Sequence, residues 1–130
     1  MANASVQAFK AALRANAQRA RGNAPARAEN EANGLADKMR AAAGAHRKSG
    51  NTVNSIQVTK AGRKTRITAG GDLTTKEVRK GSGATFDYVR AEEFGTQKEI
   101  AIPFFFNTYR AERDGIKQRL AQGIASDLTS

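Results

Sequence analysis

Two residue groups in this 130-residue chain have side chains that could take part in catalysis. Glu92 and Glu93 are adjacent carboxylates, the groups that general acid–base catalysis uses. Neighbouring positions of a helix point in different directions, so the pair is poorly placed to share a proton or to clamp a metal ion. His46 has no acidic residue close in sequence, which favours a solvated loop histidine over a base. We therefore interpret the glutamates as a solvated or subunit-facing acidic edge and expect no catalytic residue.

Two glycine-rich segments, residues 70–71 and 81–83, raise the question of a phosphate-binding loop. Neither matches the Walker pattern or the strand–glycine–helix pattern of dinucleotide sites. Hinges explain them better, because the polar stretch between them has few groups for a core. We predict that residues 72–83 form a flexible basic arm that becomes ordered on binding. A short strand within residues 74–80 is also compatible with Val78 and the threonines.

The composition excludes several classes of site. There is no cysteine, so disulfides and thiolate metal sites are ruled out, and the single histidine cannot supply a metal cluster. We expect no metal and no cofactor. No stretch is apolar enough to cross a bilayer, and the N-terminus lacks the apolar core of a signal peptide, so we expect a soluble chain with no membrane contact. The length suits a single domain over residues 1–130.

The net charge is +10 and is unevenly distributed along the chain. Residues 1–50 contribute +6, residues 51–83 contribute +5 and residues 84–130 contribute −1. A basic front would attract a polyanion or an acidic protein, and solvation of a charged face explains it equally well. Base stacking is not expected, because no aromatic residue lies between Phe9 and Phe86. The candidate polyanion or acidic-partner contacts are Lys60, Arg63, Lys64, Arg66, Lys76, Arg79 and Lys80.

Residues 1–44 have helical periodicity. Val6, Phe9 and Leu13 share one helix face, and a second phase runs from Ala28 to Ala42. Gly22 and Pro25 lie between the phases, so we predict either two helices or one long helix with a kink. Both stripes depend on alanine, which buries little area, so close helix packing or a neighbouring subunit must supply the rest.

The rest of the chain predicts a small sheet and a second long helix. Residues 45–54 read as a polar loop, and residues 55–69 as a β-hairpin, because apolar and polar residues alternate in both strands. Residues 103–125 have an apolar stripe at helical spacing. The predicted fold class is therefore α+β: a long N-terminal helical segment, a small antiparallel sheet built on a β-hairpin, and a C-terminal helix packed across it.

Five of the eight aromatic residues lie between positions 88 and 106. We predict that residues 86–125 form a helical corner and the C-terminal helix, since Gly95 can end a short helix and Pro103 suits the first turn of the next. Three consecutive phenylalanines cannot all face one core, so at least one is expected to be exposed. The predicted fold anchors are Tyr88, Phe94, Gly95, Pro103 and Phe104. The predicted subunit-interface residues are Phe105, Phe106, Glu92 and Glu93.

The order of short motifs resembles a known family. Tyr88, then Glu93-Phe94-Gly95-Thr96, then Pro103-Phe104 is similar to the pattern of the siphophage neck proteins, which include tail-completion proteins and head–tail connectors. Upstream, Ser49-Gly50 and Ser55-Ile56 stand where the family has a Thr-Gly pair and a Ser-Ile that opens a strand. The resemblance spans roughly residues 30 to 125. It departs from the family after Pro103-Phe104, where a Leu-Arg-Pro-Ala-like run is usual.

The resemblance implies a structural virion protein rather than an enzyme. Such a protein would form a homo-oligomeric ring, expected to be a hexamer, in the neck between the portal complex and the tail tube. Its partners would be itself, neighbouring neck proteins and tail-tube proteins, with non-specific contact to DNA in the channel. It would be made in the host cytoplasm and reside in the virion as a tail terminator, stopper or completion protein. The alternative is a small basic DNA-binding protein.

Overall fold

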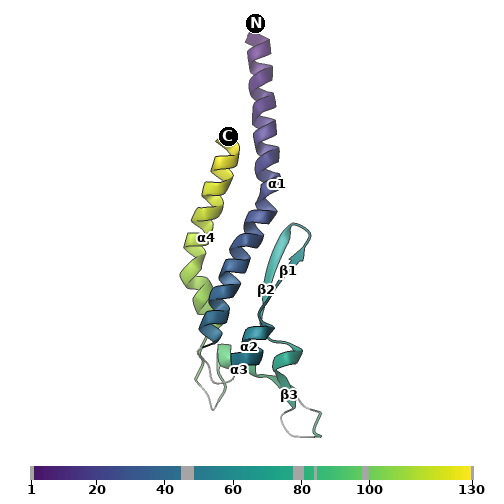
Figure 1. The fold of residues 1–130 in the computed structure, drawn as a ribbon, viewed down its shortest axis with the longest axis vertical. Helices are drawn as coiled ribbons and strands as arrows, with labels where there is room; N and C mark the ends of the chain where they lie inside the picture. The colour runs from purple at the N-terminus through teal and green to yellow at the C-terminus, as the bar shows by residue number, and fades with distance from the viewer. Residues whose placement is uncertain (1, 45–48, 78–80, 84, 98–99, 130) are drawn as a thin grey trace.

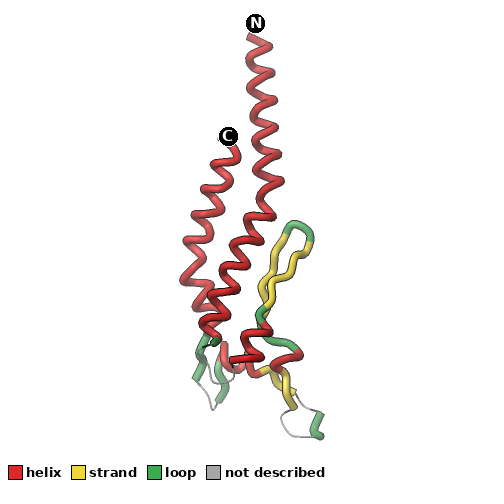
Figure 2. The backbone as a smooth tube through the Cα atoms, in the orientation of Figure 1, coloured by secondary structure: helices red, strands yellow, loops and turns green. Residues whose placement is uncertain are grey.

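The computed structural model describes residues 2–44, 49–77, 81–83, 85–97 and 100–129. Two long helices, α1 (Ala2–Ala43) and α4 (Phe104–Thr129), lie side by side and antiparallel (Figures 1 and 2). The other short elements gather around one end of α1, and the first hairpin runs from there along α1 to its middle. The first β-hairpin lies against α1, whose other side contacts α4. The structure confirms the predicted α+β class with its long N-terminal helix, antiparallel hairpin and C-terminal helix.

The N-terminal segment is one helix and not two. Pro25 lies inside α1, and helical structure continues on both sides of it (Figure 2). Proline removes one intrahelical hydrogen bond. Residues on the C-terminal side of this position are held by tertiary contacts, because Arg27 forms an ion pair with Asp127 of α4. Of the two alternatives, two helices or one long helix with a kink, the single long helix is confirmed, and the kink stays a prediction.

The α1–α4 seam is polar and narrow. Gly123 is buried where Arg27 crosses α4, and a Cβ atom at that position would lie only 2.8 Å from Cδ of Arg27. Exposed ion pairs contribute little stability. Here they fix which residues of α1 lie opposite which residues of the antiparallel helix α4. The three pairs across the seam are Arg27–Asp127 at 2.9 Å, Glu31–Arg119 at 2.8 Å and Lys38–Glu112 at 2.7 Å. The prediction that the C-terminal helix packs across the hairpin is wrong, because α4 packs along α1.

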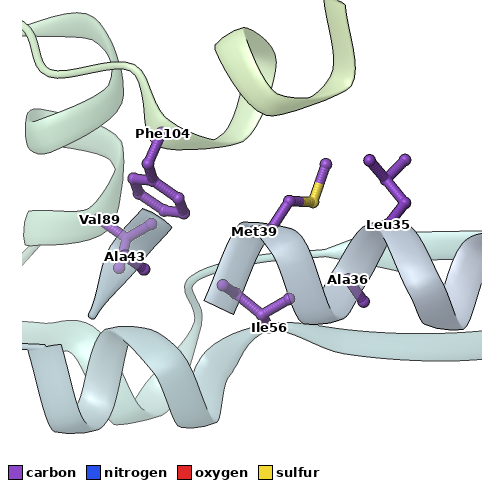
Figure 3. Packing of buried hydrophobic residues seen from close by; sticks show 7 residues of the cluster. All are labelled: Leu35, Ala36, Met39, Ala43, Ile56, Val89 and Phe104. Carbon is purple, nitrogen blue, oxygen red and sulfur yellow. The ribbon is translucent and has the colours of Figure 1, made fainter. Parts of the chain in front are cut away.

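The core lies at the C-terminal end of α1, where all the other helices meet it (Figure 3). Met39 is only 1% exposed and packs with Ile56, and Phe104 at the start of α4 closes the far side with Val89. This is a small core for a chain of this length, since much of the contact surface of α1 is alanine. The buried apolar residues of this cluster are Leu35, Ala36, Met39, Ala43, Ile56, Val89 and Phe104.

The hairpin pairs β1 (Gln57–Ala61) with β2 (Lys64–Thr68) and is shorter than the predicted 55–69. Val58 lies opposite Ile67 and both pack against the core, as the alternation predicted. The expected polar loop before it is wrong for residues 49–54, which begin a helix, α2 (Ser49–Ser55). Helix formation there buries Thr52 and places Val53 against the core, a tertiary effect that a polar sequence does not reveal.

The predicted flexible arm is partly folded. Its first half forms a 3-10 turn, η1 (Asp72–Thr74), and a strand, β3 (Thr75–Glu77), which pairs antiparallel with β4 (Thr85–Asp87). The expected short strand within residues 74–80 is therefore found, and the prediction of a flexible arm is wrong for residues 72–77. Positions 78–80 lie outside the described residues. The pairing partner is at the start of the aromatic segment, which the sequence-based prediction had treated as helical from residue 86.

Candidate subunit interface

The aromatic segment is built on a short helix, α3 (Tyr88–Phe94), with a clear start and stop. Asp87 is its N-cap, because its carboxylate accepts a hydrogen bond from the Val89 N–H. Gly95 ends it with φ of +76°, a conformation that L-residues avoid, and its N–H donates to the Ala91 carbonyl. The predicted helix with its glycine stop is confirmed. The cap was missed, although an aspartate before a helix is a recognised sequence signal.

The Asp87 carboxylate also joins this helix to the 3-10 turn. It accepts hydrogen bonds from Thr74 Oγ1 at 2.6 Å, Gly71 N at 2.8 Å and Val89 N at 3.0 Å. Burial alone would raise the pKa of Asp87, but the hydrogen bonds from Thr74 and the backbone N–H groups outweigh it, so the pKa lies below the ordinary value. Gly70 passes so close that a Cβ atom there would collide with this carboxylate.

Glu93 connects α3 to α4. Its side chain is buried, and its two carboxylate oxygens accept hydrogen bonds from Phe105 N at 2.9 Å and Phe106 N at 2.8 Å. These N–H groups belong to the first turn of α4, where no intrahelical acceptor exists and negative charge is favoured. The interpretation of Glu93 as a solvated or subunit-facing edge is therefore wrong. Glu92 is half-buried, and its backbone carbonyl accepts a hydrogen bond from Ile102 N at 2.7 Å.

The aromatic side chains of the segment have two different environments. Phe104 is buried in the core and Tyr88 packs against it, in agreement with their prediction as anchors, and Pro103 directly precedes α4. Phe94 is 64% exposed, so its prediction as a core anchor is wrong. It is the last residue of its helix, and its ring lies 6.1 Å from that of Phe106. Phe106 is exposed, as was expected of at least one phenylalanine in the run.

These exposed rings form the walls of two shallow hollows. We call the lining residues the aromatic corner. The first hollow, of about 280 Å³, is lined by Ala69, Asp87, Val89, Arg90, Glu93, Phe94, Phe105 and Phe106. The second, of about 410 Å³, is lined by Thr85, Phe86, Asp87, Arg90, Ala91, Phe94 and Gly95. Asp87, Arg90 and Phe94 stand between them, because all three residues line both hollows. The corner therefore combines exposed aromatic rings with acidic groups and one arginine in its walls.

The predicted basic contact residues that the structure describes lie on two different sheets. Lys60 pairs with Glu29 at 3.4 Å, and Arg63 donates to the Arg21 carbonyl at 2.6 Å, so both tie the hairpin to α1. Lys64 and Arg66 are exposed on β2. Lys76 lies on the second sheet, with its ammonium 5.5 Å from the centre of the Tyr88 ring. Arg79 and Lys80 lie outside the described residues.

Within the described part of the chain, no three histidine, cysteine, aspartate or glutamate side chains are grouped so that they could hold a metal ion. The helices described here also include none with the length and apolar character needed to cross a membrane. His46 lies outside the described residues. What the site offers is therefore an apolar surface with fixed geometry, suited to contact with another macromolecule.

Comparison of the chain with protein-family models, with curated proteins and with solved structures found no match. The neck-protein resemblance rests on the short motifs alone. In the structure the downstream motifs mark the limits of the two helices that meet at the aromatic corner: Tyr88 begins α3, Gly95 ends it and Pro103 precedes α4. The motif residues therefore have structural roles that do not depend on the family.

Proposed function

We propose that the protein is a structural subunit of a tailed phage or phage-like particle and that it joins head to tail. It would act as a homo-oligomeric ring in the neck, with neighbouring neck and tail-tube proteins above and below. Six copies are expected, as the family resemblance implies. In this proposal the protein works through its contacts in the assembly and not through catalysis. It would be made in the host cytoplasm and become part of the virion.

The observation that carries this proposal is the aromatic corner. A chain with only eight aromatic residues leaves Phe86, Phe94 and Phe106 exposed on neighbouring elements. Exposed aromatic clusters of this kind are typical of protein–protein interfaces, where such side chains supply much of the binding energy. Phe94 and Phe106 lie on two helices, α3 and α4, that are fixed by hydrogen bonds to the carboxylates of Asp87 and Glu93. A pre-organised apolar surface lowers the entropy lost on association.

The test of the function is electron microscopy of particles from a strain that lacks the gene. Filled heads beside separate tails are expected if the protein works at the joint. Complementation with Phe106→Asp should reproduce this defect, because a charge would lie at the centre of the exposed rings. Ala111→Asp, an exposed position elsewhere on α4, is the matched control and should restore joined virions. Normal joined particles in the deletion strain would refute the neck role.

A DNA-binding role has one observation in its favour. Lys64 and Arg66 are exposed on the hairpin in a chain of net charge +10. Two other hairpin cations, Lys60 and Arg63, already bind α1, which reduces the charge available for phosphates. A salt titration separates the two functions: a DNA binder loses affinity steeply with a slope set by several phosphates, while a ring protein shows weak, sequence-independent attraction.

A further inference from the structure

The face of α1 that packs on α4 continues beyond the end of α4. Asn16 Nδ2 donates to the Leu128 carbonyl at 2.9 Å, in the last turn of α4. Further along the seam, Ala20 is buried, and Arg27, Glu31 and Lys38 bond to α4. At about 100° per residue, Val6, Phe9 and Leu13 fall within the same arc of roughly 80° as these seam residues. The N-terminal stripe is therefore a direct extension of an existing helix–helix interface.

This extension is bare and more apolar than the covered part. Residues 2–15 extend about 21 Å past Asn16, and nothing packs beside them in Figure 1. Phe9 is 64% exposed and Leu13 is 51% exposed, whereas the covered seam is largely polar. A helix end that only faced solvent would need no such stripe. We call Val6, Phe9 and Leu13 the N-terminal stripe.

The N-terminal stripe has basic surroundings, whereas charges of both signs surround the aromatic corner. Residues 1–22 contain four basic residues, Lys10, Arg14, Arg19 and Arg21, and no acidic one. At the corner, Asp87, Glu92 and Glu93 are accompanied by Arg90, by Arg110 at 5.9 Å from the centre of the Phe106 ring and by Lys76 at 5.5 Å from the centre of the Tyr88 ring. Two copies paired stripe to stripe would bring two basic segments together, and two copies paired corner to corner would leave both stripes exposed. A pair of stripe and corner covers both apolar surfaces without that repulsion.

The first hollow of the corner is of a size to accept a side chain. Its volume of about 280 Å³ lies below the range of roughly 300–1,000 Å³ that is typical of small-molecule pockets, whereas the second hollow, of about 410 Å³, lies within that range. The apolar walls of the first hollow include Phe94, Phe105 and Phe106. A phenylalanine or leucine presented by a helix could enter such a hollow, and a buried aromatic anchor of this kind is the usual centre of a protein interface.

The stripe and the corner cannot meet within one chain. They lie at opposite ends of the molecule (Figure 1). Phe9 is separated from Ala43, next to the corner, by 34 helical residues, or about 50 Å. We propose that the N-terminal stripe of one copy docks on the aromatic corner of a second copy, with Phe9 or Leu13 entering the hollow beside Phe94. This inference rests on the self-association in the proposed function but not on the virion role.

The proposed contact is head-to-tail, since it joins two different surfaces. Repetition of such a contact closes a ring when the rotation between copies allows it, and otherwise produces a filament. Every copy in a closed ring would have its stripe covered and its corner occupied. This explains why a monomer would carry two exposed apolar surfaces at its two ends.

The test uses cysteine crosslinking, because the chain has no native cysteine. Ala12→Cys lies beside the stripe and Ala91→Cys lines the second hollow. The two purified full-length variants are mixed, oxidised and compared with a mixture of Ala11→Cys and Ala91→Cys, whose first cysteine is on the opposite face of α1. A 12–91 disulfide is expected in large excess over the 11–91 product. Phe9→Ala in the background of Ala12→Cys should weaken association at least about tenfold.

Light scattering on the unmodified 13.9 kDa chain distinguishes the ways in which the inference can fail. An oligomer that yields 12–12 or 91–91 products and no excess of 12–91 overturns the stripe–corner contact and leaves self-association standing. A chain that stays monomeric at all concentrations overturns both this contact and the proposed homo-oligomeric ring. An excess of 12–91 supports the contact even if particles without the gene prove normal, in which case only the virion role is lost.

Discussion

The two halves of α1 resemble each other in sequence and differ in surroundings. Both are rich in alanine and arginine, and both carry apolar residues at helical spacing. In the C-terminal half, Leu35 and Met39 are buried by α2, the hairpin and α4. In the N-terminal half, Phe9 and Leu13 are exposed, because α4 ends beside Asn16. Periodicity shows which face of a helix seeks a partner, but the lengths and positions of other elements decide whether it finds one in the same chain.

The same contrast separates the phenylalanines at the two ends of the molecule. Phe104→Ala should destabilise the fold by about 3–5 kcal/mol, since Phe104 closes the core beside Ala43 and Val89. Phe9→Ala is the matched control and should change the unfolding free energy of the monomer by about 0.5 kcal/mol or less, because its ring is exposed. Urea denaturation at low protein concentration measures both. Equal losses would mean that the N-terminal half is packed within the monomer.

The stability of the packed part of the molecule also depends on the connection between α3 and α4. Glu93→Ala should cost about 1.5–3 kcal/mol, because two partly buried N–H groups of the first turn of α4 lose a charged acceptor. Glu93→Gln keeps one acceptor oxygen and should lose less. Thermal denaturation with both variants provides the measurement. A wild-type melting curve for Glu93→Ala would show that water replaces this acceptor without cost, and the helices would then be joined by packing alone.

Acid should lower the stability of the packed part of the molecule, which contains Asp87 and Asp127, and should not affect the exposed N-terminal half of α1. The pKa values of Asp87 and Asp127 lie below normal, the second because Arg27 donates hydrogen bonds to it. A carboxyl with a lower pKa in the folded state binds fewer protons than it does when unfolded. Its contribution is therefore present above about pH 4 and is lost as the pH falls through the folded pKa.

This acid sensitivity is measured as the urea midpoint between pH 6 and pH 2. Asp87→Asn should be less stable than wild type at pH 6 and should lose less on acidification, because it has no carboxyl to protonate at this position. Asp114→Asn, an exposed carboxylate on α4, is the control and should follow the wild-type profile. If the urea midpoint of Asp87→Asn fell with pH in parallel with that of the wild type, the Asp87 carboxyl would not contribute to the acid sensitivity.

Deletion of residues 2–14 should have the smallest effect on folding. It removes the bare half and keeps Asn16 with its bond to Leu128, so the unfolding free energy should stay within about 0.5 kcal/mol of wild type. The circular-dichroism signal per molecule should fall with the lost helical turns. Denaturation of the truncated chain at low concentration is the measurement. A lower midpoint would show that the N-terminal half supports the fold and is not only a docking surface.

Local signals predicted the backbone structure around the corner well. The helix Tyr88–Phe94, its stop at Gly95 and the start of α4 after Pro103 all depend on short-range backbone preferences, which are present in any sequence window. The hairpin also follows from alternation and a glycine turn, Gly62 with φ of +61°. These elements were found because neighbouring residues suffice to specify them.

Roles that depend on distant partners were not predictable. Glu93 caps a helix that begins eleven residues later, and its position beside Glu92 suggested an acidic edge. Phe94 looked like an anchor by type, but as the last residue of α3 its side chain points away from the core and is exposed. Residues 49–54 looked polar and loop-like, yet tertiary contacts bury Thr52. In each case the deciding neighbour is remote in sequence.

The sequence by itself determined the two long helices, the first hairpin, the short helix before Gly95, the absence of disulfides and the basic front of the chain, since these follow from composition and short-range periodicity. Only the tertiary structure decided that α4 packs along α1, that Glu93 and Asp87 are internal caps, and that the N-terminal stripe and the aromatic corner are left uncovered at opposite ends. The reason is that burial is a property of pairs of surfaces, and the second surface of each pair comes from elsewhere in the chain.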